Sequence, residues 1–126
     1  MGRILVVDDD TTIRDLLKEI LEMNGHLVDQ ATTGKEALDL IKRNPYDLVI
    51  MDRNMPMMDG VQAVTIIRSN PGLMGMKIIM CTSASVVKEV DEAFKAGAND
   101  YVVKPIEIAK LLAKVNKNLP AAPPKQ

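Results

Sequence analysis

The chain alternates five times between a short segment with strand character and a longer segment with helical periodicity. The first run, residues 4–7 (ILVV), is uninterrupted and largely β-branched, which is typical of a strand buried on both faces of a parallel sheet. After it, apolar residues recur at spacings of three and four, which predicts an amphipathic helix that ends at Asn24-Gly25. Because parallel strands need crossover connections, five such pairs predict an open, doubly wound α/β sheet with helices on both faces.

The predicted elements follow the same alternation along the chain. Strands are expected at 4–7, 27–31, 48–51, 77–81 and 101–103, and helices at about 13–21, 35–43, 60–68, 85–96 and after Lys104-Pro105. We expect Phe94 and Ile108 to belong to the buried stripes of the last two helices. Residues 1–119 are predicted to form one domain, and the proline-rich tail 120–126 is predicted to be unstructured, as a stop or a linker.

Composition argues against several classes of function. A formal net charge of -1 provides no basic field to attract nucleic acid or an anionic membrane, and two Tyr, one Phe and no Trp are few for stacking bases or a flavin. The single Cys81 excludes an internal disulfide, and no apolar stretch is long enough to span a bilayer. We therefore expect a cytoplasmic protein that binds neither nucleic acid nor a membrane directly.

Polar side chains follow four of the five predicted strands, at the edge where a doubly wound sheet binds its ligands. In chain order they are Asp8-Asp9-Asp10, Asp52 with Asn54, Thr82-Ser83, and Lys104. Carboxylates from two strand ends would repel one another in partly desolvated surroundings unless a cation lay among them. Ligands that are all oxygen suit Mg²⁺, so a magnesium site is predicted at this edge.

A carboxylate beside Mg²⁺ can attack phosphorus and form an aspartyl phosphate. Thr82 can then donate a hydrogen bond to one phosphoryl oxygen, and Lys104 can place its ammonium beside another. Each residue also has a purely structural interpretation, because an acid among Asp8–Asp10, or Thr11, can cap the next helix, and a lysine before proline can be a surface residue. The coincidence at four strand ends favours phosphoryl transfer.

Four segments, in this order and spacing, resemble the receiver domain of two-component response regulators, of the stand-alone CheY-like kind. They are ILVVDDD at 4–10, LVIMDRNMPMMDG at 48–60, IIMCTSAS at 78–85 and AGANDYVVKP at 96–105. The resemblance covers the chain from Arg3 to about Leu119. It implies a flavodoxin-like fold with strand order 2-1-3-4-5.

The resemblance also implies a role for each matching residue. Asp52 corresponds to the phosphoacceptor, and Mg²⁺ would be held by Asp8, Asp9, Asp52 and the backbone carbonyl of Asn54. Thr82 and Lys104 correspond to the residues that contact the phosphoryl group.

The output is likewise implied by the resemblance. Tyr101 matches an aromatic residue that turns inward when Thr82 is drawn to the phosphoryl group, which repacks the surface of the fourth helix, fifth strand and fifth helix. The phosphoryl donor would be a histidine kinase or a phosphotransfer protein, and an unidentified protein would bind the output surface. Self-phosphorylation and autodephosphorylation would be the only catalysis. Ala84 stands where side chains tune the hydrolysis of the acyl phosphate.

The remaining chemically notable residues are expected to be structural. Cys81 is interpreted as a small core residue of the fourth strand, and His26 as the start of the second strand. Met55, Met57 and Met58 are expected to pack locally after the third strand.

Other functions remain open. Asp8-x-Asp10-x-Thr12 fits the nucleophile motif of haloacid-dehalogenase-like phosphatases, although that interpretation gives Asp52 no role and the chain lacks room for a longer core and cap. A flavin carrier is disfavoured because the first strand-to-helix turn is acidic where a phosphate cradle presents N–H groups. The chain could also be the receiver part of a longer DNA-binding regulator, which the length of the native gene would decide.

Overall fold

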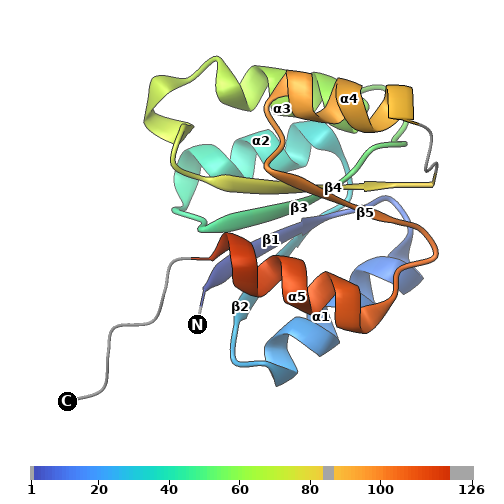
Figure 1. The fold of residues 1–126 in the computed structure, drawn as a ribbon. Helices are drawn as coiled ribbons and strands as arrows, with labels where there is room; N and C mark the ends of the chain where they lie inside the picture. Colours follow the sequence, from blue (N-terminus) through green and yellow to red (C-terminus); the bar gives the residue numbers. More distant parts are fainter. Residues whose placement is uncertain (1, 84–86, 120–126) are drawn as a thin grey trace.

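A five-stranded parallel sheet forms the centre of the molecule in the computed structural model, which describes residues 2–83 and 87–119 (Figure 1). The strands are β1 (Arg3–Val7), β2 (Leu27–Ala31), β3 (Leu48–Asp52), β4 (Lys77–Thr82) and β5 (Asp100–Val103). Their order across the sheet is β2-β1-β3-β4-β5, and every neighbouring pair is parallel. The predicted fold class and strand order are confirmed.

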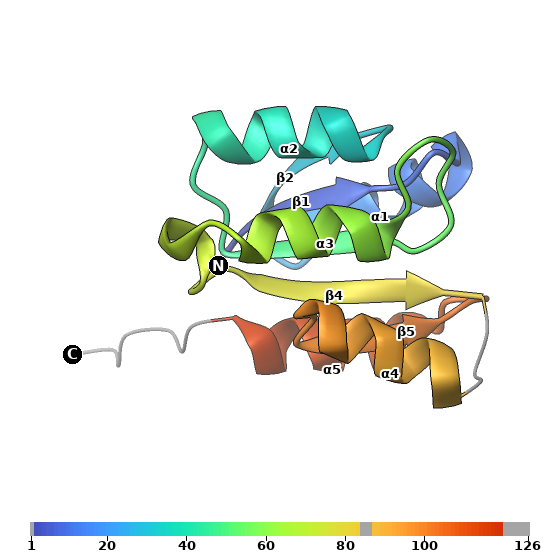
Figure 2. The same ribbon diagram turned by 90° about the horizontal axis from the view of Figure 1, so that it is seen from above.

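Helices cover both faces of the sheet. They are α1 (Thr11–Met23), α2 (Gly34–Arg43), α3 (Gly60–Arg68), α4 (Val87–Ala96) and α5 (Ile108–Asn118), with a short 3-10 turn η1 (Pro71–Leu73) before β4. Helices α1 and α5 lie on one face, and α2, α3 and α4 lie side by side on the other (Figures 1 and 2). Among the described residues, no helix is both long and apolar enough to cross a bilayer.

Strand alternation divides the core into two layers. In β3, Val49 and Met51 pack beneath α2, α3 and α4, whereas Leu48 and Ile50 pack against α1 and α5. All four side chains are at most 1% exposed. Cys81 lies in the second layer and is 2% exposed, so its assignment to the core is confirmed.

Local signals fix where the helices begin and end. Asp10 is the N-cap of α1 and its side chain accepts from the N–H groups of Thr12 and Ile13, as expected for one of the three consecutive acids. At the start of α3, Asp59 and Gln62 form a reciprocal capping box. Gly25 follows the C-cap of α1 with φ +88°, as the Asn24-Gly25 pair predicts.

Three apolar residues that were expected to be buried are exposed instead. Phe94 is 43% and Ile108 is 47% exposed, because the apolar stripe of each helix is wider than the surface that it covers. Met57 is fully exposed in the loop after β3 and has φ +71°, so its predicted packing is wrong. Met55 is buried and Met58 packs against the core, as predicted.

His26 lies directly before β2 and accepts a hydrogen bond from the backbone N–H of Gly2 at its Nδ1 atom, which agrees with its structural interpretation. Burial lowers the pKa of His26, with a further contribution from the positive N-terminus. The expectations for Ala84, for a helix start at Ser85 and for the tail 120–126 fall outside the described residues.

Candidate functional site

The site lies at the carboxyl edge of the sheet, where the polar residues at the ends of β1, β3, β4 and β5 meet as predicted. Asp8 directly follows β1, and Asp52 is the last residue of β3. Carboxylate oxygens of Asp8, Asp9 and Asp52 all lie within 4.8 Å of one another. Asp8 and Asp52 are 2% and 3% exposed, whereas Asp9 is exposed. The two buried acids therefore need a partner of opposite charge.

Lys104 supplies that charge from the segment after β5. Its Nζ donates to Asp8 Oδ2 and to Asp52 Oδ1, each at 3.1 Å. The Lys104 side chain is 20% exposed, so it joins both buried carboxylates without being fully withdrawn from solvent itself. The backbone N–H of Lys104 donates to the carbonyl of Thr82 at 2.7 Å, which fixes this segment to the end of β4. The backbone bond and the two ion pairs together tie β1, β3, β4 and β5 into one cluster.

The pKa of Asp52 lies above that of an ordinary aspartate. Burial raises its pKa to about 6, and the negative charge of Asp8 acts in the same direction. The hydrogen bond and charge of Lys104 lower the pKa of Asp52, as does the Asn54 N–H, which donates to Asp52 Oδ1 at 3.2 Å. Near neutral pH the carboxylate is therefore mostly ionised but weakly solvated, as a nucleophile requires.

Lys104 responds in the opposite direction. Burial lowers the pKa of Lys104. The hydrogen bonds to Asp52 and Asp8 and the charges of these two acids raise it by more, so the net shift of the pKa is upward. Lys104 consequently remains a cation at any physiological pH.

Thr82 and Asn54 complete the rim of the site. Thr82 ends β4 and is 2% exposed. Asn54 is exposed, and its side-chain amide donates to Ser83 Oγ at 3.3 Å, which joins the loop after β3 to the loop after β4.

Gly60 holds the loop after β3 against the strand that carries Asp52. Its N–H donates to the carbonyl of Arg53 at 2.9 Å. A Cβ at this position would lie 2.5 Å from the carbonyl oxygen of Asp52 and 2.8 Å from Arg53 Cα and from Met80 Sδ. Only glycine permits this close backbone approach.

Three long cationic side chains support the site and were not identified from the sequence. Arg14 on α1 donates to the backbone carbonyl of Asp8 at 2.9 Å. Arg53 reaches α4, and Lys114 on α5 lies 4.2 Å from the ring centre of Tyr101 and donates to the Tyr101 carbonyl. Sequence spacing does not predict where such long, flexible side chains reach. Arg14 is the exception, because a cation near the start of the helix that follows Asp8 could have been expected to contact that strand end.

Tyr101 lies between the core and the exterior. It is partly buried, and its ring meets that of Phe94 edge to face with centroids 6.0 Å apart. The same ring receives the Lys114 ammonium, which also pairs with Asp100 at 3.2 Å. Residues from α4, β5 and α5 therefore meet around one aromatic side chain.

The donor set fits a hard divalent cation. Asp8, Asp9 and Asp52 offer only carboxylate oxygens, and a cation among them would offset the negative charge that Lys104 leaves unbalanced. When bound, Mg²⁺ supplies positive charge to neutralise the oxygens of a transferred phosphoryl group.

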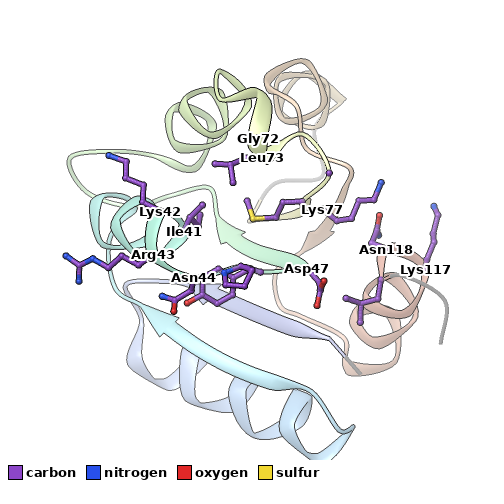
Figure 3. A pocket seen from close by; sticks show the side chains of 15 residues that line it. Ile41, Lys42, Arg43, Asn44, Asp47, Gly72, Leu73, Lys77, Lys117 and Asn118 are labelled. Carbon is purple, nitrogen blue, oxygen red and sulfur yellow. The ribbon is translucent and has the colours of Figure 1, made fainter. Parts of the chain in front are cut away.

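A large cavity of about 640 Å³ lies at the opposite end of the sheet, between the end of α2, η1 and the end of α5. Lys42, Arg43, Lys77 and Lys117 line it, but Lys42 and Arg43 extend away from the two lysines on the far side (Figure 3). The cations thus do not converge on a common point, and the cavity shares no residue with the acidic cluster.

Comparison with known proteins agrees with this geometry. The family model of the response regulator receiver domain matches residues 4–116. The chain belongs to the response regulator receiver family. It is therefore a phosphorylatable signalling switch of the two-component type, and the phosphatase interpretation of Asp8-x-Asp10-x-Thr12 is not favoured. In the structure, Asp10 of that motif serves as a helix cap.

Relatives of this receiver differ in length. It is 38% identical to the chemotaxis protein CheY of Halobacterium salinarum, over 94% of this chain and 98% of that protein. It is 41% identical to the response regulator MprA of a Mycobacterium species, over 90% of this chain but only 48% of that protein. Among solved structures, the Vibrio cholerae chemotaxis protein CheY4 superimposes with a TM-score of 0.90 at 31% identity, covering 94% of this chain and 99% of that one.

Proposed function

We propose that Asp52 is the phosphoacceptor of this receiver and that Asp8, Asp9, Asp52 and the Asn54 carbonyl hold its Mg²⁺. The observation that carries this proposal is the cluster in which one Lys104 ammonium lies 3.1 Å from both Asp8 and Asp52. Of the two buried acids, Asp52 has its pKa raised to about 6 and lies at the end of the central strand β3.

The transfer step uses the ionised form of Asp52. One carboxylate oxygen attacks phosphorus of a phosphohistidine, the new O–P bond forms as the N–P bond breaks, and the imidazole nitrogen takes the bonding electron pair. Lys104 can move from the Asp52 carboxylate to a phosphoryl oxygen while it keeps Asp8 as a partner. Thr82 donates its hydroxyl to a second phosphoryl oxygen. Hydrolysis of the acyl phosphate by water restores Asp52.

The output is proposed to pass through Tyr101. Movement of Thr82 toward the phosphoryl group frees space for the Tyr101 ring, which is already partly buried between Phe94 and Lys114. Inward rotation would break the edge-to-face contact with Phe94 and the ammonium contact with Lys114. The surface of α4, β5 and α5 would then present different side chains to a protein target.

The domain is proposed to comprise residues 1–119, with 120–126 as a stop or linker. Its last described residue, Leu119, packs against the second core layer, and a Cβ on Gly2 would lie 2.6 Å from Leu119 Cδ2.

Receiver domains take their phosphoryl group from histidine kinases, so we propose a kinase or phosphotransfer protein in the cytoplasm as donor. We also propose that catalysis is limited to self-phosphorylation and autodephosphorylation.

Phosphoramidate, which carries the N–P bond of phosphohistidine, provides the test. The purified protein is incubated with this donor and Mg²⁺, and the phosphoryl adduct is measured on wild type, Asp52→Asn and Asp8→Asn. We expect an adduct on wild type, none on Asp52→Asn, and a strongly reduced rate on Asp8→Asn that excess Mg²⁺ partly restores. Labelling of Asp52→Asn together with loss of labelling on Asp8→Asn would instead support the phosphatase interpretation.

A further inference from the structure

Arg53 follows the phosphoacceptor directly but faces the other side of the sheet. Asp52, the last residue of β3, contacts Lys104, whereas the side chain of Arg53, the first residue after β3, contacts α4. The Arg53 backbone is fixed on both sides, because its N–H donates to the Cys81 carbonyl at 2.8 Å and its carbonyl accepts from Gly60. Its contact with α4 is therefore made by the side chain alone.

That side chain joins β3 to α4 through two carboxylates. Arg53 Nη2 lies 2.6 Å from Glu92 Oε2, and Nη1 lies 3.8 Å from Glu89 Oε1. The two acids are one helical turn apart on α4, so both can reach one guanidinium. The Arg53 side chain is 19% exposed and those of Glu89 and Glu92 are 33% and 41% exposed, which places the contact between the surface and the core.

The guanidinium also has an unused donor. Arg53 Nε is buried and has no hydrogen-bond partner among the described residues. A buried donor without an acceptor costs free energy, so the Arg53 contact with α4 is weaker than that of a guanidinium whose N–H groups are all hydrogen-bonded.

We propose that Arg53, Glu89 and Glu92 form a clamp that holds α4 in its unphosphorylated position and so lowers the affinity of the Asp52 site for the phosphoryl group. This inference rests on the proposed function, because it adds a regulatory contact to the same site. In the proposed output, phosphorylation of Asp52 repacks the surface of α4, β5 and α5, and the clamp opposes that change because it holds α4 in the position seen here. By linkage, whatever the clamp contributes to the unphosphorylated arrangement is lost from phosphoryl binding.

Beryllofluoride, an inorganic mimic of the phosphoryl group, provides the probe. Its apparent Kd in Mg²⁺ is measured for wild type, Glu92→Gln and Asp91→Asn, together with hydrogen exchange of the α4 amides in each unmodified protein. Asp91 is the matched control, since it is exposed on the same helix and its substitution removes the same charge. Loss of an ion pair at this exposure corresponds to about a two- to fivefold change in the apparent Kd.

We expect Glu92→Gln to bind beryllofluoride about two- to fivefold more tightly and to exchange its α4 amides faster, whereas Asp91→Asn changes neither. The double variant Arg53→Gln with Glu92→Gln should match Arg53→Gln alone, because the partner is already missing. Equal Kd values for Glu92→Gln and Asp91→Asn, in a protein that forms a normal adduct on Asp52, would overturn the clamp alone. Absence of any adduct on wild-type Asp52 would overturn the proposed function and the clamp's coupling with it.

Discussion

Replacing Asp52 with asparagine should stabilise the protein at neutral pH in the absence of metal. The ordinary pKa of 3.8 is raised to about 6 in the folded protein. A shift of this size corresponds to at most about 3 kcal/mol of unfolding free energy once Asp52 is fully ionised. Because an asparagine side chain does not titrate and still accepts a hydrogen bond, the substitution removes this destabilising charge.

The sign of the pH dependence follows from proton binding. Between the unfolded pKa near 3.8 and the folded pKa near 6, the native protein binds more protons at Asp52 than the unfolded chain does. Stability from this group is therefore present at low pH and is lost as the pH rises through about 6. The advantage of Asp52→Asn over wild type should grow from near zero at about pH 4 to about 1–3 kcal/mol at about pH 7.5.

Urea unfolding in a metal-free buffer of low ionic strength, followed by circular dichroism across this pH range, measures the difference. Asp39→Asn is the control, since Asp39 is exposed on α2 and should show no such growth. A constant difference between Asp52→Asn and wild type, or a loss of stability at neutral pH, would refute the electrostatic account of the site.

Three other substitutions test separate parts of the structure. Lys104→Met should lower the free energy of unfolding in urea by about 1–3 kcal/mol at about pH 8 without metal, and by less at about pH 5, where Asp52 binds a proton. A decrease that does not depend on pH would contradict the pairing of Lys104 with Asp52. Met57→Asn should raise the unfolding free energy by about 0.5 kcal/mol, because asparagine tolerates the positive φ better, and a decrease would indicate a packing role for Met57. Gly60→Ala should lower the unfolding free energy by about 2–4 kcal/mol and slow phosphorylation of Asp52, and an unchanged midpoint would show that the close approach to the Asp52 carbonyl relaxes without cost.

Strands β1, β3 and β4 were predictable from the sequence because they are buried on both faces. Their apolar runs need no polar alternation, so each stood out between amphipathic segments, and the predicted limits differ from the observed ones by about one residue. The meeting of Asp8, Asp52 and Lys104 followed from the same topology, since the carboxyl ends of parallel strands share an edge.

The exposure of individual apolar residues and the contacts of long side chains could not be predicted in the same way. Helical periodicity gives the direction of the Phe94 and Ile108 stripes but not the width of the surface beneath them. Met57 stands between two methionines that do pack, yet its backbone takes a positive φ and its side chain lies in solvent. The contact of Arg53 with Glu92 joins residues 39 positions apart through a flexible side chain, for which local sequence offers no geometric signal.

Phosphorylation of Asp52 itself is tested most directly by intact mass measurement. Wild type and Asp52→Asn are incubated with Mg²⁺ and a small acyl-phosphate donor, with a parallel sample in which a chelator removes the metal. We predict one phosphoryl adduct on wild type in Mg²⁺, and none on Asp52→Asn or in the chelated sample. No adduct on wild type, or an equal adduct on both proteins, would contradict the assignment of Asp52 as the phosphoacceptor.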